Sequence, residues 1–403
     1  MVSRHYEKII VGCCFLTVFA NMGLASTAFS VHQPYIVAIP GVGDTGGSLI
    51  LSMRTFVSLL AMLVVDRYYR SLDVRRGMFV ASVCTAVGFA VYSRASDLPT
   101  FMVGAVFLGV GYGFGGMVSV TYLVNRWFAS GIGSVVGVAS MGSGLASIVV
   151  PLVIVRIIEA SSLSIAFTVE SGTALALGVL VLALVRNRPS DVGLKPYERT
   201  AGKVRTSRVS LQREAPRAER FVLFGAMVAV GVFCCCGMTY MSVLATSSGF
   251  DAVFAATLVS ISGATLTVAK FVCGELFDRL GTMRASVIMF AFALVGYVLC
   301  CFAGMGNNVV MVIAALFIGA GLSLGTVGIS VWSLDLSLPE TRSREVKNFQ
   351  VAYALGGFIA NTLPGIVKDL VGTYVVSYAA MIVVVALACL VVLRFYRRFT
   401  VSG

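Results

Sequence analysis

Twelve long apolar runs, separated by short polar segments, make up most of this sequence. A helix needs roughly 20 mostly apolar residues to cross about 30 Å of hydrocarbon, and most of the runs approach that length. Only 12% of the residues are charged, about half the share that soluble proteins carry. The runs therefore predict an all-α membrane protein with twelve transmembrane helices. They lie near residues 9–31, 46–65, 77–93, 100–124, 131–155, 163–185, 221–247, 253–275, 285–304, 308–334, 347–367 and 374–393.

Composition also excludes several classes of function. The twelve runs occupy most of the 403 residues, which leaves no room for a separate soluble domain. The net charge of +12 comes from Lys and Arg between the runs, without the aromatic-interleaved basic blocks that would indicate nucleic-acid binding. The ten cysteines lie inside apolar runs and show no metal-ligand spacing. The sequence shows no nucleophile–base set and no phosphate-binding loop, so we expect no enzyme activity, cofactor, metal or nucleic-acid partner.

The distribution of positive charge predicts the orientation in the membrane. Of the 30 Lys and Arg residues, 25 fall on one side of the span map, and Arg54 and Lys270 lie inside spans. Arg94, Arg156 and Lys368 are the ones on the other side. Positive charge concentrates in cytoplasmic loops. We therefore expect a multi-pass protein of the inner or plasma membrane with both termini cytosolic.

The sequence repeats itself at an interval of about 210 residues. Asp66-Arg67 recurs 212 residues later as Asp278-Arg279, and Pro151 recurs 213 residues later as Pro364. The pattern Gly109-x-Gly111-x-x-x-Gly115 recurs 210 residues later from Gly319. Three matches at nearly one offset predict two six-helix halves, which span residues 1–185 and 221–403. The basic segment 186–220 would join them as a linker that is mobile or forms a surface helix.

This organisation resembles the major facilitator superfamily, in which two parallel six-helix repeats enclose a substrate site near the middle of the membrane. The stretch from Gly274 to Arg284 resembles the signature that this superfamily carries between helices two and three and between helices eight and nine. The first-half copy, from Met62 to Arg76, lacks both glycines and has Met62 and Tyr69 in their place. The resemblance implies that charged residues in these loops gate the conformational change, or else fix topology at the membrane edge. These residues are Asp66, Arg67, Asp278, Arg279 and Arg284.

Two cations inside the spans are the strongest candidates for a binding site, because buried charges are costly and usually functional. Arg54 lies twelve residues before Asp66 in the second span, and Lys270 lies eight residues before Asp278 in the eighth. The two spans are repeat equivalents, so both cations are expected to face one central cavity and bind an anion. Alternatively, Lys270 reaches the surface along its flexible stem and Arg54 forms an internal ion pair.

Four further residues complete the candidate set. Glu170 is the one acid clearly inside a span, and it would pair with Arg54, carry protons or pack near the outer edge. Tyr122, Tyr240 and Trp332 are aromatic residues with polar tips at depths where they would line the cavity, although packing is the alternative for each.

A narrower resemblance points to one branch of the superfamily. Asn125-Arg126-Trp127-Phe128, followed by the glycine-rich stretch 137–144, resembles the helix 4–5 signature of oxalate:formate antiporters and bacterial monocarboxylate transporter homologues. The segment 188–196 resembles the one those proteins carry after helix six. In that family an arginine four residues before a helix-eight glycine binds the substrate carboxylate, and the matching position here is Lys270, before Gly274.

The chain differs from that family at three positions. No cation follows Tyr353 on helix eleven, where oxalate carriers are expected to have one. The helix-one lysine of mammalian-type monocarboxylate carriers corresponds to Pro34, which His32 precedes, and their helix-eight aspartate corresponds to Leu266. These differences argue against oxalate and against simple proton–lactate symport. Arg54 would supply the second cation instead.

Taken together, the sequence predicts a secondary active transporter of a small mono- or dicarboxylate, acting as a monomer in the lipid bilayer by alternating access. The small number of cavity carboxylates slightly favours anion exchange over proton symport. An inorganic-anion carrier of the nitrate type and a transporter-like sensor are the alternatives. Proton-driven drug export is disfavoured, because two buried cations would repel cationic drugs.

Overall fold

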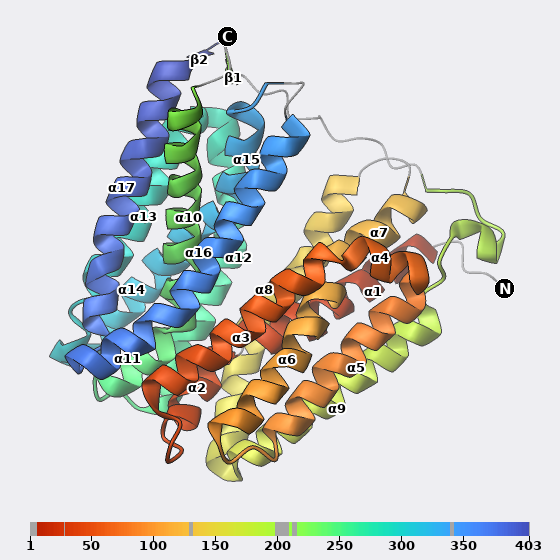
Figure 1. The fold of residues 1–403 in the computed structure, drawn as a ribbon, viewed down its shortest axis with the longest axis horizontal. Coiled ribbons are helices and arrows are strands. Elements are labelled where there is room, and N and C mark those ends of the chain that lie inside the picture. Colours follow the sequence, from red (N-terminus) through yellow and green to blue (C-terminus); the bar gives the residue numbers. More distant parts are fainter. Residues whose placement is uncertain are drawn as a thin grey trace. The chain divides into compact units, whose positions relative to one another are not determined.

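The computed structural model describes residues 6–27, 29–128, 132–197, 209–211, 216–338 and 342–402. The chain forms two compact units, 1–204 and 205–403, and the division between them falls inside the segment 186–220. Apart from one pair of three-residue strands, the described secondary structure is helical, so the predicted all-α fold is confirmed. Figure 1 shows the helices of each unit running side by side.

The N-terminal unit contains six helical passes. The first pass consists of α1 (Tyr6–Val18), a π-helical segment (Phe19–Thr27) and α2 (Phe29–Val37). The second is α3 (Gly43–Leu63), which leads into the short α4 (Val65–Ser71). The remaining passes are α5 (Val74–Tyr92), α6 (Leu98–Gly115) continued by α7 (Met117–Trp127), α8 (Ile132–Ala160) and α9 (Leu163–Leu184). Within this unit α5 packs between α6 and α9, while α8 packs on α1 and the π-helical segment.

The C-terminal unit repeats the same order of passes. These are α10 (Arg217–Thr239) with α11 (Met241–Ser247), α12 (Ala252–Leu280), α13 (Thr282–Cys300), α14 (Asn308–Gly321) with α15 (Val327–Asp335), α16 (Arg342–Val371) and α17 (Val375–Phe399). Short 3-10 turns lie at Ala303–Met305 and at Leu322–Gly325. In this unit α10 packs on α16 and α17, and α14 packs on α12 and α13.

Eleven helical stretches among the described residues are long and apolar enough to cross a membrane. The helix α16 covers the predicted eleventh span and has 30 residues, but it is not one of these eleven. It carries Glu345 near one end and Lys368 and Asp369 near the other, which lowers its apolar character. It packs against α10 as a twelfth pass.

The repeated glycines let neighbouring helices approach closely in equivalent places of both units. A Cβ atom at Gly109 of α6 would lie 2.6 Å from the carbonyl oxygen of Arg54 in α3. At Gly319 of α14, a Cβ would overlap the carbonyl oxygen of Ser262 in α12. Small residues allow such contacts in lipid, where packing rather than the hydrophobic effect holds helices together.

The described parts of segment 186–220 do not form a long surface helix. Pro189–Val192 is a single 3-10 turn, and the backbone N–H of Tyr197 donates to the carbonyl oxygen of Trp127 at 2.8 Å. Further along, β1 (Val209–Leu211) pairs antiparallel with β2 (Thr400–Ser402). A piece of the predicted linker is therefore bound to the C-terminal end of the chain.

Candidate functional site

Arg54 lies in the middle of α3 and its side chain is only 7% exposed. Its Nη1 donates a hydrogen bond of 2.6 Å to the carbonyl oxygen of Ala25, and its guanidinium lies 5.8 Å from the centroid of the Phe29 ring. Ala25 belongs to the π-helical segment of the first pass. Such segments interrupt the regular hydrogen-bond pattern of a helix and are frequent at functional sites. Arg54 thus holds a positive charge beside irregular backbone inside the unit.

Glu170 lies beside His32, at the interface of α9 and α2. The distance from His32 Nε2 to Glu170 Oε2 is 2.9 Å, and the two side chains are 0% and 2% exposed. The imidazole also stacks on the ring of Phe167, with centroids 4.7 Å apart. The sequence left three roles open for Glu170: pairing with Arg54, carrying protons, or packing near the outer edge. In the structure its carboxylate lies beside His32 in a buried pair.

Lys270 is half-buried on α12 and forms no ion pair with any residue that the structure describes. Gly274 lies one helical turn further on, on the same face. Apart from the backbone of its own helix, no atom of the described residues lies within 4 Å of the place where a Gly274 side chain would begin. A side chain at Gly274, one turn from Lys270, would therefore meet open space.

The three candidate aromatic residues differ in their surroundings. Tyr240 is fully buried at the break between α10 and α11, and its hydroxyl donates to the carbonyl oxygen of Asn361 at 2.7 Å. Trp332 is fully buried, and its indole N–H donates to Ser286 Oγ at 2.9 Å. Tyr122 is half-exposed, with its ring centroid 5.2 Å from that of Tyr69. The polar atoms of Tyr240 and Trp332 therefore take part in packing, and Tyr122 is the most accessible of the three.

The predicted gating residues lie at the start of α4, at the end of α12 and at the start of α13. The side chains of Asp66 and Asp278 are outside the described part of the structure. Arg67 and Arg284 are exposed. Arg279 is also exposed and its Nε donates to Glu275 Oε1 at 2.6 Å, one turn earlier on the same helix. An exposed pair of this kind contributes little stability, so it can break during a conformational change at small cost.

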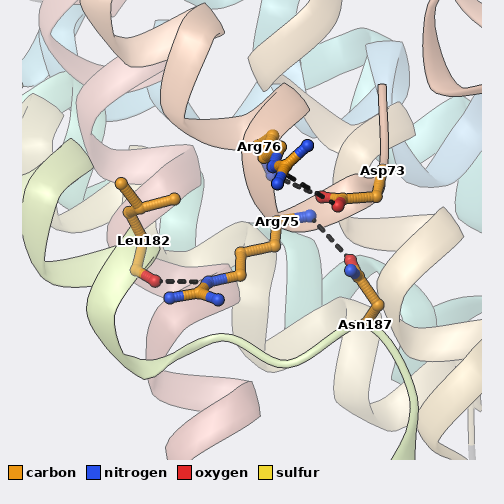
Figure 2. Close-up of polar contacts among 5 residues, drawn as sticks. All are labelled: Asp73, Arg75, Arg76, Leu182 and Asn187. Carbon is orange, nitrogen blue, oxygen red and sulfur yellow. Dashed lines mark hydrogen bonds and ion pairs between the residues drawn. The ribbon is translucent and has the colours of Figure 1, made fainter. Parts of the chain in front are cut away.

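Figure 2 shows a better-connected set of polar contacts at the start of α5. Asp73 accepts a hydrogen bond of 2.8 Å from the backbone N–H of Arg76 and so caps the helix. The Nε of Arg75 donates to the carbonyl oxygen of Leu182 at 2.6 Å, and its backbone N–H donates to Asn187 Oδ1 at 2.9 Å. These bonds tie the start of α5 to the end of α9. Arg75 satisfies a carbonyl that the C-terminus of α9 would otherwise leave open.

Tyr69 takes a structural role at a position where the superfamily signature has a glycine. Its ring is buried, and its hydroxyl donates to the carbonyl oxygen of Phe114 at 2.6 Å. A Cβ at Gly77 of α5 would overlap this ring. In this half, a large side chain against a glycine on the neighbouring helix fills the space between α4, α5 and α6.

Sequence reasoning missed two residues. His32 was noted only for its place before Pro34, and its pairing with Glu170 depends on how α2 and α9 pack. Asp335, at the end of α15, is 2% exposed and accepts hydrogen bonds from Thr282 Oγ1 at 2.6 Å and Tyr396 Oη at 3.1 Å. In the sequence, Asp335 could have been recognised as an acidic residue at the end of the tenth apolar run, in a chain with only 18 acidic residues. It joins α15 to α13 and α17.

An open surface pocket of about 510 Å³ lies between α5, α6 and α9 of the N-terminal unit. Val87, Arg94, Thr100 and Thr168 are among its lining residues. None of the predicted site residues lines it, and the hydroxyl of Thr168 is bonded to the backbone of its own helix. This pocket is distinct from the region of Arg54.

Comparison with known proteins finds one matching family and several similar structures. Residues 13–361 match the family model of the Major Facilitator Superfamily, whereas no curated protein sequence matches the chain. Among solved structures, the chain resembles the nucleoside transporter NupG (TM-score 0.73, 12% identity, covering 96% of this chain and 99% of that one). It also resembles the D-xylose–proton symporter (TM-score 0.70, 14% identity, 97% of each chain). A third similar structure is a bacterial homologue of the human lysosomal transporter Spinster (TM-score 0.69, 12% identity, 98% of each chain). At these identities the likeness shows the fold alone.

Proposed function

Because the chain belongs to the major facilitator superfamily, we propose that it is a secondary active transporter that carries a small organic anion by alternating access. The observation that carries the proposal is the presence of two cations, Arg54 and Lys270, within membrane-spanning helices that occupy equivalent places in the repeat. A charge in a membrane span is costly unless it is compensated, and such residues mark substrate pathways. Together, two cations favour an anion and disfavour neutral or cationic cargo.

The two cations would contribute differently to anion binding. The guanidinium of Arg54 is planar and can hold a carboxylate with two parallel hydrogen bonds. Lys270 acts as a point charge on a flexible stem, next to the open position at Gly274. A small mono- or dicarboxylate is the substrate class that fits the charge of these two cations best.

The three aromatic residues would contribute to the site in different ways. Tyr122 is partly exposed and lies beside Tyr69, fifteen residues beyond Arg54 along the chain, so it would contact the anion on its way to or from Arg54. Since the hydroxyl of Tyr240 and the indole N–H of Trp332 already have partners, these two side chains would act by holding α10, α11 and α15 in position around it.

Alternating access would require the exposed charged loops to open and close one face of the protein. We place Asp66, Arg67, Asp278, Arg279 and Arg284 on the cytosolic side, together with both termini, because most Lys and Arg residues lie on that side of the span map. The exposed Arg279–Glu275 pair is weak enough to exchange partners during transport.

A thermal-unfolding screen of the purified protein tests the substrate class. The compounds are mono- and dicarboxylates, nitrate, and neutral and cationic controls. A ligand present at a hundred times its Kd should stabilise the protein by about 2.7 kcal/mol. We expect a carboxylate to raise the melting temperature of the wild type and of Lys195→Gln, an exposed control in the segment 186–197. The same carboxylate should leave Lys270→Gln unshifted.

Other results of the unfolding screen would support a different function. Stabilisation by nitrate in place of carboxylates would identify an inorganic-anion carrier, for which the same two cations would serve. Stabilisation by a neutral or cationic compound alone would show that the two-cation argument is wrong. A carboxylate that binds but does not accumulate in proteoliposomes would indicate a sensor instead of a carrier.

A further inference from the structure

Two titratable side chains lie next to each other inside the N-terminal unit without any other polar partner among the described residues. His32 and Glu170 are 0% and 2% exposed, and their nearest atoms, Nε2 and Oε2, are 2.9 Å apart. The two atoms lie at ion-pair distance but are not aligned as a hydrogen bond. Among the described residues, neither ring nitrogen of His32 and neither carboxylate oxygen of Glu170 has a hydrogen-bond partner. Phe167 covers one face of the imidazole. This is an acid–base pair enclosed by aromatic rings.

Burial limits the number of protons that such a pair holds. With one proton, the pair has no net charge, whether it is written as imidazolium and carboxylate or as imidazole and carboxylic acid. Without a proton it carries one negative charge, and with two it carries one positive charge. Because an uncompensated buried charge is costly, the pair exchanges a single proton, and nearby charges decide how tightly that proton is held.

The structure describes few charged or titratable groups around the pair. The helix α3 contributes Arg54, and Asp44 at its start, and α5 contributes Tyr92, whose ring lies 5.3 Å from that of Phe167. On α8, Arg156 and Glu159 are exposed, and Glu159 interacts with Tyr35 of α2. The π-helical segment has no titratable residue. The ionisable residues of α1, and the others of α5, lie toward the opposite ends of those helices.

Arg54 is close enough to influence the proton. Its guanidinium lies 5.8 Å from the centroid of Phe29, which lies 6.1 Å from that of His32, so the two groups are within about 12 Å of each other. At an effective dielectric constant of about 20, a unit charge at about 12 Å changes a proton affinity roughly tenfold. The positive charge of Arg54 favours the deprotonated, negative pair. An anion bound to Arg54 removes that effect.

We propose that the His32–Glu170 pair is the proton-binding site of this protein, and that anion binding at Arg54 drives it to take up a proton. The proton would enter with the anion and leave with it, so that a monocarboxylate crosses together with one proton and no net charge. The buried pair thus favours proton coupling over the anion exchange that the sequence slightly favours. By linkage, the proton must strengthen anion binding by the same factor as the anion strengthens proton binding. The coupling rests on the proposed anion transport, whereas the proton site itself rests on the geometry of the pair.

The first experiment observes the proton directly. The chain contains only two histidines, His5 and His32, so His5→Asn with histidine labelled for NMR gives a signal from His32 alone. We expect this signal to titrate with pH. Glu170→Gln should lower the midpoint by about one pH unit or more, because the imidazolium loses its anionic neighbour. A His32 signal that does not titrate, or that ignores Glu170→Gln, would overturn the proton site.

The same sample then tests the coupling, with acetate, lactate and oxalate as probes. A saturating probe that stabilises the protein in the unfolding screen should raise the His32 midpoint by about one pH unit, which corresponds to the tenfold effect above. An unchanged midpoint would overturn the coupling. If none of the probes binds, the anion-transport proposal fails, while the titration without ligand still decides the proton site.

Transport in proteoliposomes provides a second readout. In the wild type an inward proton gradient should drive accumulation of the labelled carboxylate beyond the level that exchange alone produces. Glu170→Gln should lower the ratio of gradient-driven accumulation to exchange about tenfold, whereas Glu159→Gln, the same change at an exposed position of α8, should keep the wild-type ratio. If Glu170→Gln does not fold, His32→Gln serves the same purpose. A wild type that does not respond to the proton gradient would contradict the proposal.

Discussion

The guanidinium of Arg54 donates a hydrogen bond to the carbonyl oxygen of Ala25, and this bond joins α3 to the π-helical part of the first pass. A charged residue in a span is thereby held against backbone that departs from α-helical geometry. Irregular backbone at membrane depth is tolerated where it is buried in protein or lines a cavity. The Arg54–Ala25 contact therefore marks the part of the N-terminal unit where we expect the anion to be recognised.

Two substitutions of Arg54 should show how much its positive charge and its planar guanidinium each contribute to carboxylate binding. Arg54→Lys keeps the charge but loses the planar fork, and Arg54→Gln loses both. Hydrogen bonds to charged groups contribute about 1.5–3 kcal/mol, so we expect Arg54→Lys to weaken carboxylate binding about tenfold and Arg54→Gln to abolish it. Isothermal titration of the purified variants measures both. Equal affinity in wild type and Arg54→Gln would remove Arg54 from the site.

At Lys270, we expect the substitution by arginine to be tolerated. The charge is preserved, and the open space at Gly274 leaves room for the larger guanidinium. Arginine can bind a carboxylate through two hydrogen bonds, so Lys270→Arg should bind the carboxylate as tightly as the wild type or more tightly. Lys270→Gln should not bind it. If binding is lost in Lys270→Arg as well, the flexible stem of lysine would be the essential feature.

The repeated glycines make a prediction about stability. A methyl group at Gly319 would overlap the carbonyl oxygen of Ser262 and lie 2.9 Å from the Cβ of Thr265. The close packing of α14 on α12 gives no space for it, and overpacking costs about 1–3 kcal/mol. Gly319→Ala should therefore lower the melting temperature.

The matched control for Gly319 is Gly172→Ala on α9, where no atom lies within 4 Å of the new methyl group. Alanine favours a helix over glycine by up to about 1 kcal/mol, so this variant should be as stable as the wild type or slightly more so. A Gly319→Ala protein with unchanged stability would mean that α12 and α14 are less tightly packed than described.

Asp335 should contribute to stability through both of its partners. Asp335→Ala would remove the acceptor of the Thr282 and Tyr396 hydroxyls in a buried place, at a cost of about 1–3 kcal/mol for a hydroxyl that finds no other acceptor. Tyr396→Phe removes its hydrogen bond to Asp335 but keeps the bond from Thr282, and should cost about 0.5–1.5 kcal/mol. Thermal unfolding of the single and double variants measures these values. Strictly additive losses would show that the two side chains do not interact.

The number and order of the passes could be predicted from the sequence, because each span needs a long apolar run and each run can be recognised locally. The places where a helical pass breaks or changes its geometry could not be predicted from the sequence. Gly116, at the break between α6 and α7, and Tyr240, between α10 and α11, lie inside continuous apolar runs. Such a break depends on the helices packed around it.

At the candidate site, too, some features could be predicted from the sequence and others could not. That Arg54, Lys270 and Glu170 lie in spans follows from local sequence, because a charge in an apolar run is conspicuous and costly. What each one contacts depends on how the helices pack. The tertiary structure placed Glu170 beside His32, Arg54 on the Ala25 carbonyl, and the polar atoms of Tyr240 and Trp332 on partners within their own unit. The reason is physical: residence in the membrane depends on local composition, whereas the partner of a buried polar group depends on which helix faces meet.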